Sequence, residues 1–457
     1  MGVSPVNGLQ LLMICLLVCG AVGGWPQLSL VAAGLAVLGC LLQWRQLLKL
    51  ARLFCFGAVL MAALVAIRCP DKLDTLARSL EQGAAFAALM MVLGMLRHPV
   101  RRSPFVREAA RYLLVYPPSA RYTATNIGAH FLSLLFNVGV ITMIGDLSKH
   151  LDSTKASGGA ASSAMVVAAM RGAALVSIWS PIGLGFAIVT TGIPSLDPLR
   201  FLFAALGFTA LALLITAKWP MLPQAAQVPL NHEPPLSPPT KGPLIGTLAI
   251  CIVLLLIVMG IHRWLDVSFT LASVAMVPLF ALGWLILEDA DEPASLRQEL
   301  RNTIDGLGNL RSESAMFMSA NVLGAGLSML VQTLPGWQSL AVGDIPVLPA
   351  LLLCLVVIPL VAACYIPNSI VVVMAAQLLG NSPLGQHYPM ALALTLAVAW
   401  AVAISVSPIS AMNLITGSLC GVTSRRAALV WNRPFAVTLT LLAGALIALV
   451  VLVEFQQ

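Results

Sequence analysis

The chain has 457 residues, of which 59% are hydrophobic and 9% are charged, and its mean hydropathy is +0.94. These values exclude a water-soluble globular protein, and the short polar loops leave no room for a soluble catalytic domain. The formal net charge of +7 does not indicate a nucleic-acid partner, because the basic residues are scattered through loops. We therefore expect a protein that functions inside the bilayer.

The nine cysteines are odd in number and show no metal-ligand spacing, so we expect neither disulfides, nor a metal site, nor any other bound cofactor. The first apolar stretch, at 9–22, lacks a basic segment before it and is soon followed by another apolar stretch. This pattern predicts a first membrane helix rather than a cleaved signal peptide.

The first half contains seven apolar segments long enough to enter or cross a bilayer about 30 Å thick. They lie at 8–22, 27–43, 53–68, 83–97, 124–146, 164–193 and 198–218. Basic and apolar residues are interspersed at 97–121, which predicts an interfacial helix leading into the segment at 124–146.

Seven prolines between Trp219 and Gly242 exclude a helix there and indicate a linker. The second half then repeats the series of apolar segments, at 244–261, 268–287, 314–331, 346–380, 389–419 and 431–453. We therefore predict a first membrane repeat at 1–218, a Pro-rich linker at 219–243 and a second repeat at 244–457.

Two tripeptides recur between the halves. Ser180-Pro181-Ile182 and Ser407-Pro408-Ile409 are 227 residues apart, and each lies inside a long apolar segment that is followed by one more span. Val92-Leu93-Gly94 and Val322-Leu323-Gly324 are 230 residues apart. The parallel order of elements favours duplication over chance.

The distribution of Lys and Arg favours a topology in which 124–146 and 346–380 are re-entrant hairpins and the other eleven segments cross. In this topology 19 of the 25 basic residues are cytoplasmic, Arg171 is inside the membrane and five are outside. The linker and the N-terminus are then cytoplasmic, the C-terminus is periplasmic and the halves are inverted. We expect this orientation in an inner membrane of the bacterial type.

The predicted fold is thus an all-α polytopic membrane protein with two inverted-topology repeats. It has about eleven transmembrane helices, two re-entrant hairpins, and discontinuous helices at 164–193 and 389–419.

Each Ser-Pro pair places an N-cap residue before a proline suited to the first helical position. A helix therefore ends and another begins inside the apolar segment, which leaves free carbonyls on one side and free amides on the other. Carbonyls suit Na⁺ and amides suit an anion, and transporters build midplane sites from such breaks. The alternative is an ordinary proline kink.

The hairpin tips, at 136–139 and 365–369, each offer an Asn whose amide can reach a substrate or a cation. Alternatively, Asn137 and Asn368 are simple loop caps. We predict Na⁺, if it binds, at Asn137, Ser180, Asn368 and Ser407. The full set of predicted substrate-binding and ion-binding residues is Asn137, Gly139, Thr142, Ser180, Pro181, Thr190, Asn368, Ser369, Ser407, Pro408, Ser410 and Asn413.

Two ionisable residues inside apolar segments have two interpretations each. Arg171 either attracts an anionic substrate or extends its side chain to the membrane interface. His130 either relays protons or is hydrogen-bonded within the first hairpin.

In its inverted halves, its interfacial segments before the hairpins, its Asn-bearing tips and its broken helices, the chain resembles the ion transporter superfamily. That group includes divalent anion/sodium symporters and arsenite permease-like carriers. Its symporters carry Ser-Asn-Thr motifs at both tips, where this chain has Asn137-Val138-Gly139 and Asn368-Ser369-Ile370. The resemblance implies a homodimer in which the hairpins and broken helices move against a scaffold.

The leading hypothesis is a secondary active transporter, coupled to Na⁺ or H⁺, for a small and anionic organic substrate. The alternative on the same fold is an efflux permease for a drug, an oxyanion or a metabolite. A membrane-embedded enzyme is disfavoured because the ionisable residues are scattered and form no dyad, and paired half-helices fit alternating access better than a channel.

Overall fold

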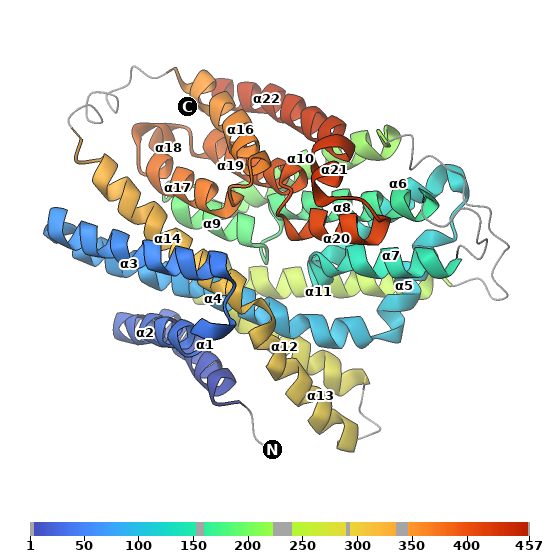
Figure 1. The fold of residues 1–457 in the computed structure, drawn as a ribbon, viewed down its shortest axis with the longest axis horizontal. Coiled ribbons are helices and arrows are strands. Elements are labelled where there is room, and N and C mark those ends of the chain that lie inside the picture. The colour runs from blue at the N-terminus through green and yellow to red at the C-terminus, as the bar shows by residue number, and fades with distance from the viewer. Residues whose placement is uncertain (1–3, 152–159, 223–239, 289–292, 335–345, 456–457) are drawn as a thin grey trace.

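The computed structural model describes residues 4–151, 160–222, 240–288, 293–334 and 346–455, and these residues form helices and turns with no strand. Most helices run roughly along the long axis of the molecule (Figure 1). The helices of the first half are α1 (Pro5–Gly23), α2 (Pro26–Leu42), α3 (Lys49–Arg68), α4 (Leu73–Arg102), α5 (Pro104–Leu114), α6 (Pro118–Phe136), α7 (Gly139–Leu151), α8 (Ala160–Trp179), α9 (Leu184–Gly192) and α10 (Pro198–Lys218). Those of the second half are α11 (Gly242–Leu265), α12 (Phe269–Glu288), α13 (Pro293–Asp305), α14 (Arg311–Val331), α16 (Val347–Ala363), α17 (Asn368–Gly380), α18 (Pro383–His387), α19 (Pro389–Val406), α20 (Ala411–Cys420), α21 (Ser424–Arg426) and α22 (Arg433–Phe455).

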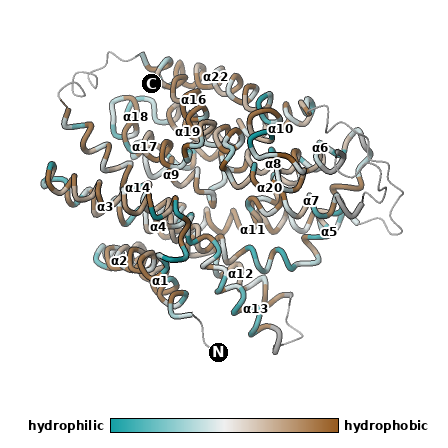
Figure 2. The backbone as a smooth tube through the Cα atoms, in the orientation of Figure 1, coloured by the Kyte–Doolittle hydropathy of each residue, from teal (hydrophilic) through white to brown (hydrophobic). Residues whose placement is uncertain are grey.

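Ten helical segments of the described chain are long and apolar enough to cross a membrane, and α2 is a further apolar helix of 17 residues. Apolar residues predominate along many of these helices (Figure 2), and some of them are exposed. On α3, for example, Leu53, Phe56 and Val59 are all more than half exposed. Such a surface suits hydrocarbon, so the prediction of an all-helical polytopic membrane protein is confirmed.

Both predicted discontinuous helices are present. The first segment is interrupted between Trp179 and Leu184, where α8 gives way to α9. The second is interrupted between Val406 and Ala411, where α19 gives way to α20. Each predicted hairpin is likewise a helix, a short turn and a second helix, formed by α6 with α7 and by α16 with α17.

Several predicted boundaries are wrong, because hydropathy marks the apolar part of a helix rather than its ends. α4 has 30 residues instead of the 15 predicted at 83–97, and it continues through charged residues at both ends. The interfacial helix expected at 97–121 is shorter, since only α5 lies between α4 and α6. The polar helix α13 carries no hydropathy signal, and the π-helix η5 (Ala427–Trp431) is apolar but only five residues long, so neither was predicted. Most of the predicted linker, 223–239, lies outside the described residues.

The two halves meet along α4 and α14, which pack antiparallel. Asn321 Nδ2 donates a hydrogen bond of 2.6 Å to the carbonyl of Ser79, and Ser314 Oγ donates one of 3.3 Å to the carbonyl of Ala87. Residue numbers thus rise on one helix as they fall on the other. This is the arrangement expected of equivalent helices in halves of opposite orientation.

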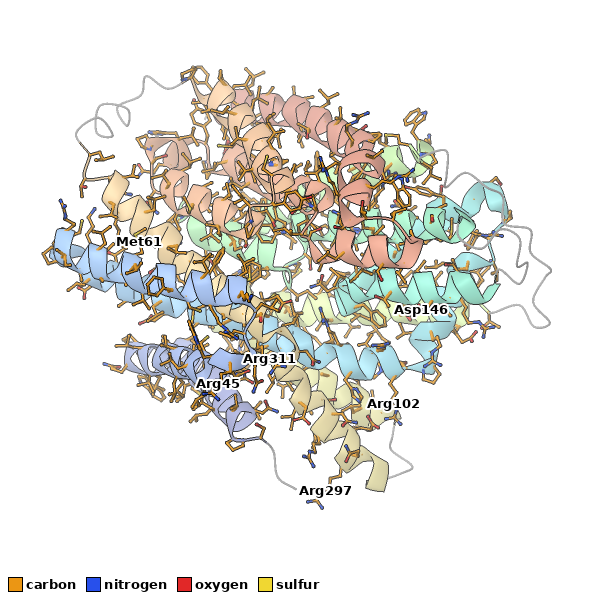
Figure 3. All side chains as sticks on the ribbon, viewed as in Figure 1. Arg45, Met61, Arg102, Asp146, Arg297 and Arg311 are labelled. Carbon is orange, nitrogen blue, oxygen red and sulfur yellow. The ribbon has the colours of Figure 1, made fainter. Side chains whose placement is uncertain are left out.

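Four arginines from both halves lie on the same side of the molecule. Arg45, Arg102, Arg297 and Arg311, all predicted to be cytoplasmic, lie in the lower half of the view in Figure 3. There α13 is tied to the end of α4, because Glu299 accepts a 2.5 Å hydrogen bond from His98 and lies 3.6 Å from Arg102.

Candidate functional site: two broken helices and two hairpin tips

The first break leaves helix-end carbonyls without the donors that a continuous helix supplies. Pro181 has no N–H to offer the carbonyl of Ser177, and the N–H of Gly183 donates instead to the carbonyl of Ser180 at 2.8 Å. Ser180 Oγ is also buried, in a residue only 1% exposed, and has no hydrogen-bond partner among the described residues. Buried polar atoms are nearly always paired, so this hydroxyl is a candidate to bond a ligand.

The half-helix after this break is anchored to neighbouring helices. Ser273 Oγ, on α12, donates a 3.3 Å hydrogen bond to the carbonyl of Pro181. Phe186, on α9, stacks on Phe201 of α10 with ring centroids 5.2 Å apart and meets Phe269 of α12 edge-on at 5.3 Å. These contacts hold the start of α9 in place.

The second break is closed by a side chain. Asn413 is fully buried, and its Nδ2 lies 3.1 Å from the carbonyl oxygen of Ile404, 2.9 Å from that of Ser405, 3.0 Å from that of Ser407 and 3.1 Å from Ser410 Oγ. An amide nitrogen carries only two hydrogens, so it can satisfy at most two of these four oxygens at once. Ser410 also caps α20 by accepting from the backbone N–H of Asn413 at 3.3 Å.

A hydrogen-bond chain connects the second break to Arg171. Asn432 Nδ2 donates to Asn413 Oδ1 at 3.2 Å, and Arg171 Nε donates to Asn432 Oδ1 at 3.4 Å. The other guanidinium N–H groups donate to Tyr122 Oη at 3.1 Å, to the carbonyls of Pro220 and Met221, and to the carbonyl of Trp431 at 2.8 Å. Sequence reasoning missed Asn432 and Tyr122, since neither lies in a motif or in a repeat.

Of the two alternatives for Arg171, extension of its side chain to the membrane interface does not fit its burial. Its side chain lies eleven residues into α8, is fully buried, and sits 5.3 Å from the ring centroid of Phe435. A guanidinium has five N–H donors, and all five are occupied by neutral protein acceptors. An anion could therefore bind Arg171 directly only by displacing these acceptors.

Both hairpin tips contain a non-glycine residue with positive φ, which is uncommon and indicates local strain. These residues are Asn137, with φ of 51°, and Tyr365, with φ of 66°. Asn137 is exposed and its N–H donates to the carbonyl of Ser133 at 2.7 Å. Asn368 is the first residue of α17, and its Nδ2 is buried without a hydrogen-bond partner among the described residues.

The remaining residues of the predicted substrate-binding and ion-binding set contribute less to the breaks and the hairpin tips. Thr190 Oγ1 donates to the carbonyl of Phe186, one turn earlier in its own helix, at 2.9 Å. Gly139 begins α7, and Thr142 is partly buried on that helix. Ser369 is 5% exposed at the start of α17, and Pro408 is buried in the second break.

Each hairpin packs against the broken helix of the other half. A Cβ added at Gly145 of α7 would lie 2.7 Å from the Leu419 side chain of α20, and one added at Gly192 of α9 would lie 2.6 Å from Cβ of Ala376 on α17. The pairs α7 with α20 and α9 with α17 are therefore in close contact. Each hairpin also packs against the broken helix of its own half, since α6 and α7 contact α8, and α16 and α17 contact α19.

His130 lies beside the first break. Its Nδ1 is 3.0 Å from the carbonyl oxygen of Gly172, and its Nε2 is 3.1 Å from the indole nitrogen of Trp179, the last residue of α8. A carbonyl only accepts and an indole N–H only donates, so these partners select the neutral tautomer protonated at Nδ1. His130 is therefore hydrogen-bonded to α8, and not within the first hairpin as one of the two alternatives expected.

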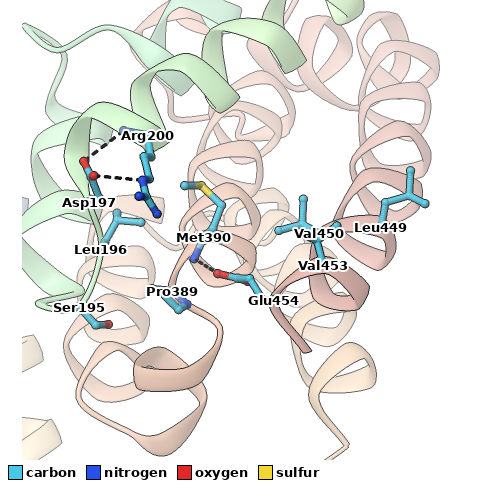
Figure 4. Close-up of a pocket in the computed structure, with 10 residues that line it drawn as sticks. All are labelled: Ser195, Leu196, Asp197, Arg200, Pro389, Met390, Leu449, Val450, Val453 and Glu454. Carbon is cyan, nitrogen blue, oxygen red and sulfur yellow. Dashed lines mark hydrogen bonds and ion pairs between the residues drawn. The ribbon is translucent and has the colours of Figure 1, made fainter. Parts of the chain in front are cut away.

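A cavity lies away from these breaks, between the start of α10, the start of α19 and the end of α22. It has a volume of about 410 Å³ and a polar rim of Asp197, Arg200 and Glu454 (Figure 4). Asp197 accepts from the backbone N–H groups of Leu199 and Arg200, and Glu454 accepts from those of Met390 and Ala391. These carboxylates cap helices, so we assign them a structural role.

No protein-family model matches this sequence, and no curated protein matches it either. Among solved structures, the YdaH transporter of Alcanivorax borkumensis, whose crystal structure is described as revealing an unusual topology, is similar with a TM-score of 0.53. The match covers 89% of this chain and 98% of that one, at 14% identity. The chain thus has the fold of a membrane transporter.

Proposed function

We propose that the chain is a secondary active transporter that carries a small organic anion by alternating access. The observation that carries this proposal is the reciprocal packing of each hairpin on the broken helix of the other half. Such packing allows both halves to contribute to one site while the hairpins move against the rest of the protein.

Paired helix N-termini supply the chemistry for an anion. The last residues of α9 and α17, Gly192 and Gly380, touch, and the helices have nine and thirteen residues. We propose that the two helices run in the same direction, which at about 1.5 Å per residue would place their N-termini within roughly 6 Å of the same level. Helix N-termini carry partial positive charge and free N–H groups, so a carboxylate is a suitable ligand between them.

Na⁺ is the coupling ion that the first break fits best. The helix-end carbonyls of this break and the unpartnered Ser180 Oγ are neutral oxygens, which suit a hard cation. Proton coupling would need a titratable group, and the nearest one, His130, has both ring nitrogens engaged. The residues that we assign to Na⁺ are Ser177, Ile178, Trp179 and Ser180.

These features support membership of the ion transporter superfamily, which implies a homodimer. The orientation that we propose, in an inner membrane, rests on the distribution of basic residues. The same site serves uptake or efflux, because the direction of flux follows the gradients that are imposed.

Proteoliposomes test the proposal. Succinate, benzoate, an alkyl sulfonate and sulfate are supplied in turn with an Na⁺ gradient in either direction, and charge movement is recorded on a solid-supported membrane. We expect a saturable, Na⁺-dependent signal for at least one carboxylate, reduced more than about tenfold by Ser180→Ala or Asn368→Ala. Thr440→Ala, on the distant helix α22, is the control and should transport normally. Normal flux in both site variants would exclude these residues from the site.

A further inference from the structure

The two Ser-Pro-Ile breaks differ at one position in a way that separates their ion chemistry. At the repeat spacing of 227 residues, the residue equivalent to Asn413 is Phe186. Asn413 turns its amide back onto the end of α19, whereas Phe186 packs on Phe201 and Phe269, away from the end of α8. The first break therefore has no amide side chain at the position from which Asn413 reaches the carbonyls of the second.

We propose that the Arg171–Asn432–Asn413 chain replaces a coupling cation at the second break. The Nδ2 atom of Asn413 occupies the centre of four oxygens that belong to Ile404, Ser405, Ser407 and Ser410, at 2.9 to 3.1 Å. Four neutral oxygens around one point are a ligand set for a hard cation, and here an amide fills it.

The positive charge comes from the other half of the protein. Arg171 donates to Asn432, and Asn432 in turn donates to Asn413, so every amide in the chain is oriented with its N–H group toward the second break. Hydrogen bonds in series polarise one another, and a buried cation strengthens this effect. Arg171 thus acts on the break as a permanent charge that does not dissociate.

This inference rests on the proposed function, because it assigns the coupling ion to one break only. It revises the sequence-based expectation of Na⁺ at Ser407. Transport would then be coupled to cation binding at the first break, while the second break stays closed by protein throughout the cycle.

Asn413→Asp tests the inference in the purified full-length protein. The substitution replaces the donating nitrogen by a carboxylate oxygen, so the second break gains a negative charge that should recruit Na⁺ to its oxygens. We expect the melting temperature of this variant to rise by about 3 °C or more between 1 and 300 mM NaCl beyond any rise in wild type, and not in choline chloride. Asn381→Asp, at an exposed position, is the matched control and should respond as wild type does.

Folded Asn413→Asp protein whose melting temperature responds to Na⁺ no more than wild type would overturn the inference. Recovery of folded protein only when Na⁺ is present would support it. If Asn413→Asp does not fold with or without Na⁺, the same melting-temperature measurement is made on Asn413→Ala, which removes the amide from among the four oxygens. Failure of Na⁺ to stabilise that variant beyond wild type, or to permit its folding, counts against the inference.

The test also separates this inference from the proposed function. A wild-type protein without any Na⁺ response would contradict the coupling ion assigned to the first break. The gain of an Na⁺ response in Asn413→Asp would still identify the second break as a cation cage closed by an amide.

Discussion

Gly380 lies directly against the carbonyl oxygen of Gly192, so that the last turn of α17 and the last residue of α9 meet through backbone alone. Because neither residue has a side chain, the second hairpin can approach the first broken helix more closely there than any other residue pair would allow.

Gly380→Ala should separate these helices. Its Cβ would overlap the Gly192 carbonyl, and overpacking of this kind costs about 1–3 kcal/mol. We expect a lower melting temperature and a large loss of transport. Gly207→Ala, in α10, meets no atom within 4 Å and is the control, which should be neutral or slightly stabilising. Equal melting temperatures and equal transport rates in the two variants would show that the close approach of α17 to α9 is not needed for stability or transport.

Arg171→Lys should destabilise the protein by at least about 2 kcal/mol, because one ammonium cannot serve the acceptors that the guanidinium bonds and a buried acceptor left unpaired is costly. The measurement is thermal unfolding. In the folded fraction we expect an unchanged KM, since Arg171 has no free donor for a substrate. Arg200→Lys, at an exposed arginine, is the control. A selective rise in KM with normal stability would instead indicate that Arg171 attracts the anion.

The elements that sequence could predict are those with a strong local signal. Apolar segments, the proline breaks and the turns at Asn137 and Asn368 follow from hydropathy and from backbone chemistry, and the structure places each of them where it was expected. Helix ends were less predictable, since α4 continues through charged residues that hydropathy assigns to loops.

The contents of the site were only partly predictable. Asn413 was selected as a polar residue after a break, but its role depends on Asn432, which is 19 residues away, and on Arg171, which comes from the other half. No spacing rule connects residues that meet only through tertiary packing. The packing of α7 on α20 and of α17 on α9 has the same origin.

Asn137 gives a test that separates backbone strain from side-chain binding. Its φ of 51° is easy for glycine and costs about 1 kcal/mol or more for alanine. If the tip needs only this conformation, Asn137→Gly should transport normally and Asn137→Ala should be less stable. Uptake and melting temperature are measured for both. Loss of uptake in the glycine variant at normal stability would show that the amide itself contacts the substrate or ion.

Substitutions of His130 test whether transport is coupled to protons. Glutamine can donate to the Gly172 carbonyl and accept from the Trp179 indole, so His130→Gln should keep at least about half of the transport rate and the wild-type dependence on pH. His130→Ala leaves both partners unpaired and should lower stability by about 1–3 kcal/mol for each. Transport is followed in liposomes with an imposed pH gradient or an Na⁺ gradient. If His130→Gln abolishes the response to the pH gradient in folded protein, the imidazole carries the coupling proton, and the assignment of Na⁺ to the first break is wrong.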